Sequence, residues 1–206
     1  STINATSTNG AAIGSGTENS TTDNITITNS TITATAEQGA GIGSGFNSSA
    51  SCGNITISGG TITGTTGIEI RAGELNVTGG TITGTGESYT STANGNGSTT
   101  SGAGIAISQH TTKKAVTVNI SGYDTNISGA NALAVSNPQN NDGTASTTGT
   151  VSATIDGGTL TSTTTASSSS STNGNAVLVQ NANVNLTVND GTLDGNVTVT
   201  KDTAKN

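Results

Sequence analysis

A short phrase of alternating threonine and isoleucine recurs along this chain, and it limits the possible folds more than any other feature. It reads NITITNSTITA, NITISGGTITG and LNVTGGTITG in its clearest copies, at 24–34, 54–64 and 75–84. Looser copies follow at 118–129, 153–162 and 186–195. Alternation of apolar and polar residues is typical of a strand with one buried face. Because the unit repeats, the sequence predicts stacked coils, each burying its apolar side chains against the next.

Each repeat can be divided into three short strands. The first ends at an aliphatic residue that recurs as Ile27, Ile57, Val77, Ile120, Ile155 and Val188. A corner of Gly-Gly or similar residues follows, and such residues tolerate the positive φ that a sharp bend needs. The second strand has one inward side chain, taken in turn from Ile3, Ile32, Ile62, Ile82, Ile127, Leu160 and Leu193. The third strand supplies Ile13, Ile42, Ile68/Ile70, Ile105/Ile107, Leu133/Val135, Val177/Val179 and Val197/Val199.

These patterns predict an all-β fold, a right-handed single-stranded parallel β-helix (solenoid) of about seven three-strand coils. Successive copies are separated by as few as 20 residues (Ile57 to Val77) and as many as 43 (Val77 to Ile120), so the coils must carry insertions. The Ser/Thr/Asn-rich segments 86–101, 137–149 and 162–174 are predicted to be flexible loops. We expect residues 1–206 to form one domain, an excerpt of a longer chain, because the sequence starts within a coil.

Composition agrees with a narrow solenoid and excludes several partners. Hydrophobic residues make up only 29% of the chain, which suffices when each coil buries a few aliphatic side chains. A net charge of −7 argues against nucleic acid, whose phosphates are neutralised by Lys and Arg. No apolar run is long enough to span a bilayer. Cys52 is the single cysteine, which excludes an internal disulfide.

Parallel β-helices also serve as polysaccharide lyases and hydrolases, so an enzyme is one function that the predicted fold allows. Hydrolysis of a glycosidic bond usually needs two carboxylates facing each other across a groove. Asp156 and Asp190 fall at one corner of successive coils, but Asp also favours turns by bonding its own backbone. Glu69 and Arg71 are expected on the solvent face, and His110 has no second ligand or nucleophile beside it. We therefore predict no catalytic or metal-binding residue, and a lyase- or hydrolase-like enzyme remains an alternative.

Carbohydrate binding is the prediction that the aromatic residues support. Sugar sites commonly combine an aromatic platform with a few polar groups. Tyr89 lies within the insertion 86–101 and Tyr123 replaces a corner glycine, so both are expected to be exposed and are the candidate glycan-binding residues. Asp and backbone carbonyl oxygens could bind calcium, but no Asp-x-Asp-x-Asp-Gly run is present, and no cofactor is predicted.

A second binding surface is predicted from the outward threonines of the second strands. These residues should stand in register as Thr31, Thr33, Thr61, Thr63, Thr81, Thr83, Thr159 and Thr161. The resulting Thr-x-Thr ladder resembles the ice-binding face of β-helical antifreeze proteins, which makes ice binding an alternative function. Asn4, Asn126 and Asp194 interrupt the ladder, and Thr is also simply a favourable residue on an exposed strand.

The phrases GNITISGGTITG (53–64) and GAGIGSG (39–45) resemble repeats in large surface proteins of anaerobic bacteria. In that family such strings build parallel β-helices, and some members are described as carbohydrate-binding-domain proteins. The resemblance implies an extracellular or cell-surface protein of bacterial origin. The leading prediction is thus a non-enzymatic surface module that acts as an adhesin, stalk or glycan-binding scaffold. Its partner would be carbohydrate or another cell-surface ligand, and its coil ends would allow end-to-end self-association.

Overall fold

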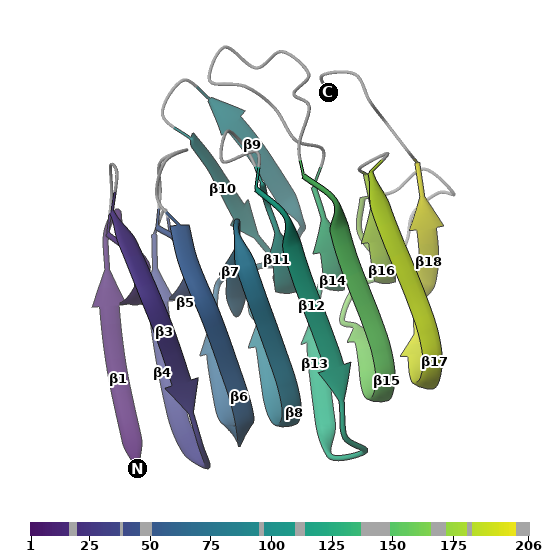
Figure 1. Cartoon of the computed structure of the whole chain (residues 1–206), viewed down its shortest axis with the longest axis horizontal. Coiled ribbons are helices and arrows are strands. Elements are labelled where there is room, and N and C mark those ends of the chain that lie inside the picture. The colour runs from purple at the N-terminus through teal and green to yellow at the C-terminus, as the bar shows by residue number, and fades with distance from the viewer. Residues whose placement is uncertain are drawn as a thin grey trace.

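The computed structural model describes residues 1–16, 20–37, 39–45, 51–94, 97–109, 114–136, 149–165, 172–180 and 183–200. Over these residues the chain forms β-strands and no helix, as the sequence predicts. The strands stand side by side from the N-terminal to the C-terminal end of the molecule (Figure 1). An all-β architecture of parallel strands, compatible with a parallel β-solenoid, is therefore established.

The larger sheet holds nine strands, and the strands pair in parallel. They are β1 (Thr2–Ser7), β3 (Thr21–Ile27), β4 (Ser30–Ala36), β6 (Ser51–Gly64), β8 (Gly73–Gly84), β12 (Val116–Ser121), β13 (Thr125–Gly129), β15 (Val151–Ser162) and β17 (Val184–Asp194). This sheet contains both the first and the second strands of the predicted repeat.

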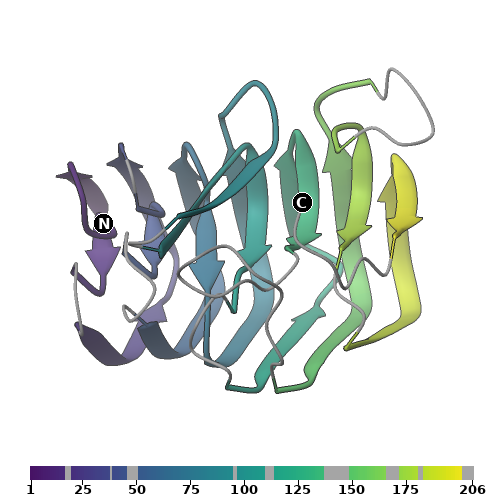
Figure 2. The ribbon, with the colours of Figure 1, turned by 90° about the horizontal axis from the view of Figure 1, so that it is seen from above.

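The second sheet holds seven strands, also paired in parallel, and consists of the predicted third strands. They are β2 (Ile13–Gly14), β5 (Ile42–Gly43), β7 (Ile68–Ile70), β11 (Ala103–Ile107), β14 (Asn131–Val135), β16 (Asn175–Val179) and β18 (Asn196–Val199). Viewed from above, the chain passes from one sheet to the other and back as it advances (Figure 2). The seven strands occur in the sheet in the order of the sequence.

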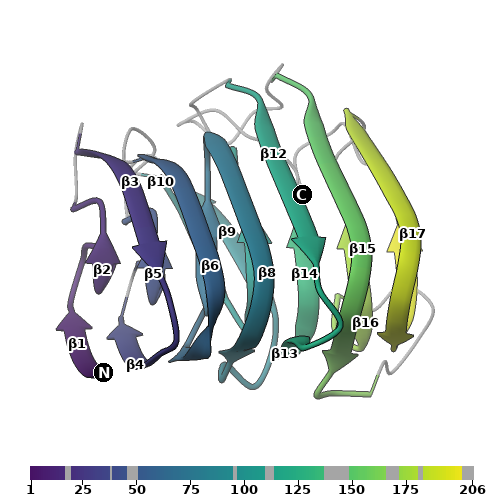
Figure 3. The same cartoon turned by 60° about the horizontal axis from the view of Figure 1, so that its bottom comes forward.

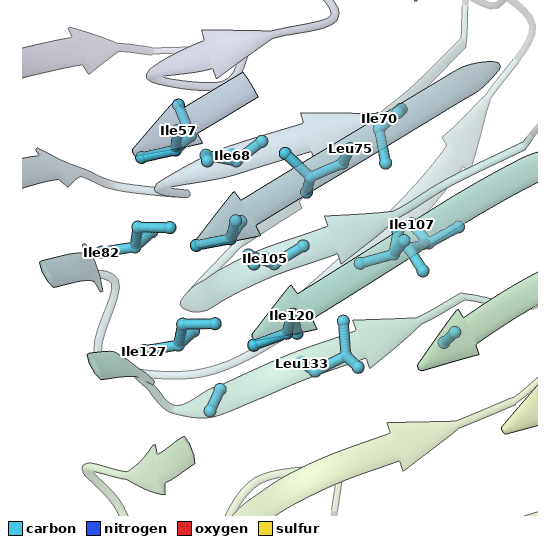
Figure 4. Packing of buried hydrophobic residues seen from close by; sticks show 14 of the residues in the cluster. Ile57, Ile68, Ile70, Leu75, Ile82, Ile105, Ile107, Ile120, Ile127 and Leu133 are labelled. Carbon is cyan, nitrogen blue, oxygen red and sulfur yellow. The ribbon is translucent and has the colours of Figure 1, made fainter. Parts of the chain in front are cut away.

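The predicted register is confirmed residue by residue. Ile27, Ile57, Val77, Ile120, Ile155 and Val188 are successive partners on neighbouring strands. The second-strand row, from Ile3 to Leu193, and the third-strand rows pair as expected. Figure 4 shows side chains from these rows converging between the two sheets. The inward aliphatic residues of neighbouring strands thus form one continuous buried cluster.

The corner between the first and second strands differs from the prediction. The strands β6, β8 and β15 run through their Gly-Gly corners without interruption, as the long curved strands of Figure 3 show. Register irregularities occur at the corner, between Ile57 and Thr61. The reason is that a glycine such as Gly60, with φ at 96°, bends the strand while backbone pairing resumes beyond it. The described part of the chain therefore forms two large sheets where the sequence predicted three strands per coil.

The insertion 86–101 is also more regular than predicted. It forms an antiparallel hairpin of β9 (Thr90–Asn94) and β10 (Gly97–Ser101), with Thr90 paired to Ser101. β10 lies beside β7 in Figure 1. Thr and Ser-rich segments can pair as strands once a surface is available to hold them, because Thr is β-branched. Residues 137–148 and 166–171 of the other two insertions lie outside the described residues.

Candidate functional site

The most exposed large hydrophobic side chain of the described residues, Tyr123, stands at a corner of the larger sheet. It belongs to the turn between β12 and β13, where Gly122 has a φ of 81° and the Thr125 N–H donates to the Gly122 carbonyl (3.1 Å). The tyrosine is 83% exposed, as the sequence predicts for a residue that replaces a corner glycine. Its hydroxyl donates a hydrogen bond to Oδ2 of Asp190, at 3.1 Å.

This hydrogen bond reaches across one intervening strand of the larger sheet. Asp190 lies on β17, and the strand between it and the Tyr123 turn is β15, which carries Asp156 as the direct partner of Asp190. At about 4.8 Å per strand, the tyrosine must reach roughly 10 Å along the corner. The intervening corner is Gly157-Gly158, and a Cβ on Gly157 would stand 3.2 Å from the Gly122 nitrogen. A side chain at this corner would therefore crowd the backbone of the β12–β13 turn.

The electrostatics of this corner are negative. Asp190 raises the pKa of the Tyr123 hydroxyl above its usual value of 10.0, first by accepting its hydrogen bond and then by its charge, and Asp156 adds a smaller charge effect. The other oxygen of Asp190 accepts the Gly191 N–H at 2.7 Å. Asp124, the next residue in the chain, is a third exposed acid. No ion pair in the described part of the chain involves these three acids.

Tyr89 is not exposed, and the expectation that it would be is wrong. Only 4% of its surface is accessible, because it packs in a cluster on the outer side of the seven-stranded sheet. The other members of this cluster are Ala103, Ala106, Ala130, Ala134 and Leu178. The Tyr89 N–H donates to Oδ1 of Asn173, in the insertion 162–174, at 2.6 Å. The two tyrosines therefore lie on different parts of the surface, and only Tyr123 presents its ring to solvent.

Glu69 and Arg71 contradict their prediction in the same way. Both project outward from β7, as the alternation indicates, but their side chains are 1% and 0% exposed. Nε of Arg71 donates to Oε1 of Glu69 at 2.9 Å, and the Thr100 hydroxyl donates to Oε2 at 2.8 Å. Thr100 belongs to β10, so the hairpin covers a face that the repeat pattern alone assigns to solvent.

The threonine ladder is in register as predicted. Thr31, Thr61 and Thr81 are successive partners, and so are the threonines two positions further along each strand. The row continues through Asn126 to Thr159 and Thr161, so the predicted interruption is also found. The threonines are exposed on β4 and half-buried on β8 and β15.

A buried asparagine ladder was not predicted. Asn131 and Asn175 are partners at the start of β14 and β16, and both are fully buried. The Asn175 side-chain amide donates to Oδ1 of Asn131 at 2.9 Å, and the Thr198 hydroxyl donates to Oδ1 of Asn175 at 2.6 Å. The sequence held the signal, since Asn131, Asn175 and Asn196 each open a third-strand phrase.

The remaining candidates add no second site. Asp156 and Asp190 are neighbours as expected and both are exposed. No group of three His, Cys, Asp or Glu side chains that could bind a metal ion occurs among the described residues. Two open polar grooves, of about 400 Å³ beside Asp194 and about 340 Å³ beside Glu37, contain neither tyrosine. His110 and Phe46 lie outside the described residues.

In comparisons with known proteins, no family model, curated protein or solved structure matches this chain. The described residues include no helix with the length and apolar character needed to cross a membrane. The geometry of the Tyr123 corner is thus the main guide to function.

Proposed function

We propose that this chain is a right-handed β-solenoid of about seven coils that serves as a non-enzymatic, extracellular scaffold and binds carbohydrate at the Tyr123 corner. The observation that carries the proposal is an aromatic ring that is 83% exposed and yet tied by its hydroxyl to Asp190 at 3.1 Å. The role of an adhesin or stalk on a bacterial surface is supported by the resemblance of the repeats at 53–64 and 39–45 to those of bacterial surface proteins.

The hydrogen bond from the Tyr123 hydroxyl to Asp190 orients the ring before a sugar binds. The ring is attached at the β12–β13 turn and at Asp190 two coils away, so little side-chain freedom remains to be lost on binding. Apolar C–H faces of sugars stack on aromatic rings, while neighbouring carboxylates accept hydrogen bonds from sugar hydroxyls. Asp156 and Asp190 would supply those acceptors.

The charge of the corner selects the kind of sugar. Asp190 accepts the hydrogen bond of the ring hydroxyl, and Asp156 acts on it by charge. Within the described part of the chain the single arginine is buried against Glu69. A uronate or sialate would be repelled by these carboxylates, whereas a neutral or amino sugar would be accepted. We expect binding to fall in the order amino sugar, neutral hexose, uronate.

A panel of neutral, amino-sugar and uronic-acid oligosaccharides tests this function. The unmodified protein should bind members of the first two classes, and Tyr123→Ala should weaken binding by roughly tenfold or more if stacking contributes about 1.5 kcal/mol. Tyr123→Phe, which keeps the ring and loses the hydrogen bond to Asp190, should fall between them. Absence of binding to every glycan would refute the proposal, and release of oligosaccharide products would instead support the enzyme alternative.

Ice binding is a second candidate, favoured by the threonine register. The partners Thr31–Thr61–Thr81 and Thr33–Thr63–Thr83 form two parallel rows of methyl and hydroxyl groups. The unmodified protein should show thermal hysteresis, and the variant Thr63→Tyr should lose it because the larger side chain disrupts the rows. An unmodified protein that shows neither hysteresis nor inhibition of ice recrystallisation would exclude this function.

End-to-end association would extend the scaffold. Side chains whose counterparts are buried inside the stack are partly exposed at its two ends, with Ile3 at 41%, Val188 at 45%, Val197 at 50% and Val199 at 47%. Sheet edges of this kind can pair with another chain. The particle mass should rise with concentration in light scattering, and Val199→Lys should suppress the rise. A mass that stays monomeric at every concentration would refute self-association.

A further inference from the structure

Two charged side chains, those of Glu69 and Arg71, are buried but do not belong to the apolar core between the two sheets. Glu69 lies on β7 and Arg71 directly follows this strand, and their side chains have exposed fractions of 1% and 0%. A buried ion pair usually adds little to stability compared with apolar residues of similar volume, but its directional bonds can specify one arrangement among several. We infer that Glu69 is a positioning residue that sets where the hairpin β9–β10 docks on the seven-stranded sheet.

The hairpin needs such a contact because its own sequence specifies its register poorly. β9 reads TSTAN and β10 reads GSTTS, so neither strand has an apolar face that distinguishes one alignment from the next. Strands that are small and polar on both faces are prone to register slippage. The position of this hairpin must therefore come from contacts with the body of the protein.

Glu69 supplies the contact that holds Thr100 of β10. Oε1 accepts from Nε of Arg71 at 2.9 Å, which fixes the carboxylate, and Oε2 accepts from the Thr100 hydroxyl at 2.8 Å. The Thr66 hydroxyl, from the turn before β7, donates to the Thr100 carbonyl at 2.6 Å. Side chain and backbone of Thr100 are thus both recognised. Loss of the Thr100 hydroxyl would leave a buried carboxylate oxygen without its donor and release the hairpin from this face of the sheet.

The consequence of this alignment is the placement of Tyr89. That residue immediately precedes β9, and it fills the cluster formed by Ala106, Ala134 and Leu178 on the outer face of the second sheet. Its N–H reaches Asn173 of the insertion 162–174. The contact at Thr100 thereby holds the insertion 86–101 in place. This insertion and the insertion 162–174 contact each other through Tyr89 and Asn173.

Hydrogen exchange of backbone amides tests the inference, because exchange reports opening of the hairpin separately from opening of the core. Thr100→Val keeps the side-chain shape and removes the donor to Glu69. It should accelerate exchange in 90–101 by roughly tenfold to a hundredfold, the range for a lost bond to a charged group. Amides of β6 and β8 should be unchanged. Glu74→Gln, a change at a half-buried carboxylate on β8, is the matched control and should leave the hairpin unaffected.

The double variant Glu69→Leu/Arg71→Met separates positioning from stability. It replaces the ion pair with apolar side chains, so the midpoint of global unfolding should be kept while hairpin protection is lost. Unchanged hairpin exchange in Thr100→Val would overturn the inference. It would also be overturned if the variants accelerated exchange equally in the hairpin, β6 and β8, because the pair would then act on stability alone. If the double variant does not fold, Thr100→Val alone decides between the two outcomes, because it leaves the Glu69–Arg71 ion pair intact.

Discussion

The corner glycines of β8 allow a matched test of how this strand is bent. Gly80 has a φ of 100°, and a Cβ there would stand 2.8 Å from the Gly60 carbonyl oxygen. At Gly79, the preceding residue, the nearest atom to a Cβ would be the Gly59 nitrogen at 3.9 Å, an ordinary contact. The two substitutions Gly79→Ala and Gly80→Ala are therefore adjacent in sequence and identical in chemistry, but they differ in backbone conformation and space.

The expected magnitude follows from that difference. Both alanines reduce the freedom of the unfolded chain, a gain of about 0.4–1 kcal/mol that cancels between the variants. A non-glycine residue held at the φ of Gly80 costs about 1–3 kcal/mol. Gly80→Ala should thus have a free energy of unfolding lower than that of Gly79→Ala by about 1–3 kcal/mol.

Urea denaturation followed by circular dichroism measures this difference, provided that the slope of free energy against denaturant is the same for both variants. Gly79→Ala should be as stable as the unmodified protein or slightly more stable. Equal stability of the two variants, or a larger loss in Gly79→Ala, would refute the proposed role of positive φ at the corner.

Three further predictions concern the core, the asparagine ladder and the Tyr123 corner. Ile62→Ala, at a fully buried position, should lower the free energy of unfolding by about 2–5 kcal/mol, whereas Ile3→Ala, at a position 41% exposed, should cost less than half as much; equal losses would contradict the stacked core. Asn175→Ala should cost about 1–3 kcal/mol in the same assay, because Asn131 and Thr198 lose a buried partner; an unchanged midpoint would contradict this. In an ultraviolet absorbance titration, Asp190→Asn should lower the pKa of Tyr123 toward its usual value. Because the pKa is raised in the folded protein, the associated stability is present below pH 10.0 and is lost as the pH rises through the folded value. A titration that is the same in both proteins would show that Asp190 does not act on the phenol.

The parts of the fold that follow from period-two alternation could be predicted from sequence. The row from Ile27 to Val188 pairs as aligned, because each residue stands before a corner and must face inward for the coil to have a core. The outward direction of Glu69 was predictable for the same reason. Its burial was not, since alternation tells which face a side chain takes and not whether an insertion covers that face.

In the candidate site, too, the features set by the repeat pattern could be predicted, and those set by contacts distant in sequence could not. Tyr123 could be placed at an exposed corner because it replaces a glycine of the repeat. Its bond to Asp190 depends on contacts 67 residues apart in sequence. The Ser/Thr/Asn-rich composition of the insertion predicts a loop and an exposed Tyr89, whereas the ring packs against the outer side of the second sheet.

The most direct test of the proposed function uses the fact that the chain has two tyrosines and no tryptophan. Protein labelled with fluorotyrosine should give two fluorine NMR signals, one from buried Tyr89 and one from exposed Tyr123, assigned with Tyr123→Phe. Addition of an amino-sugar or neutral oligosaccharide should shift the Tyr123 signal in a saturable manner and leave the Tyr89 signal in place. A Tyr123 signal unmoved by every glycan class, or a shift confined to Tyr89, would contradict carbohydrate binding at this corner.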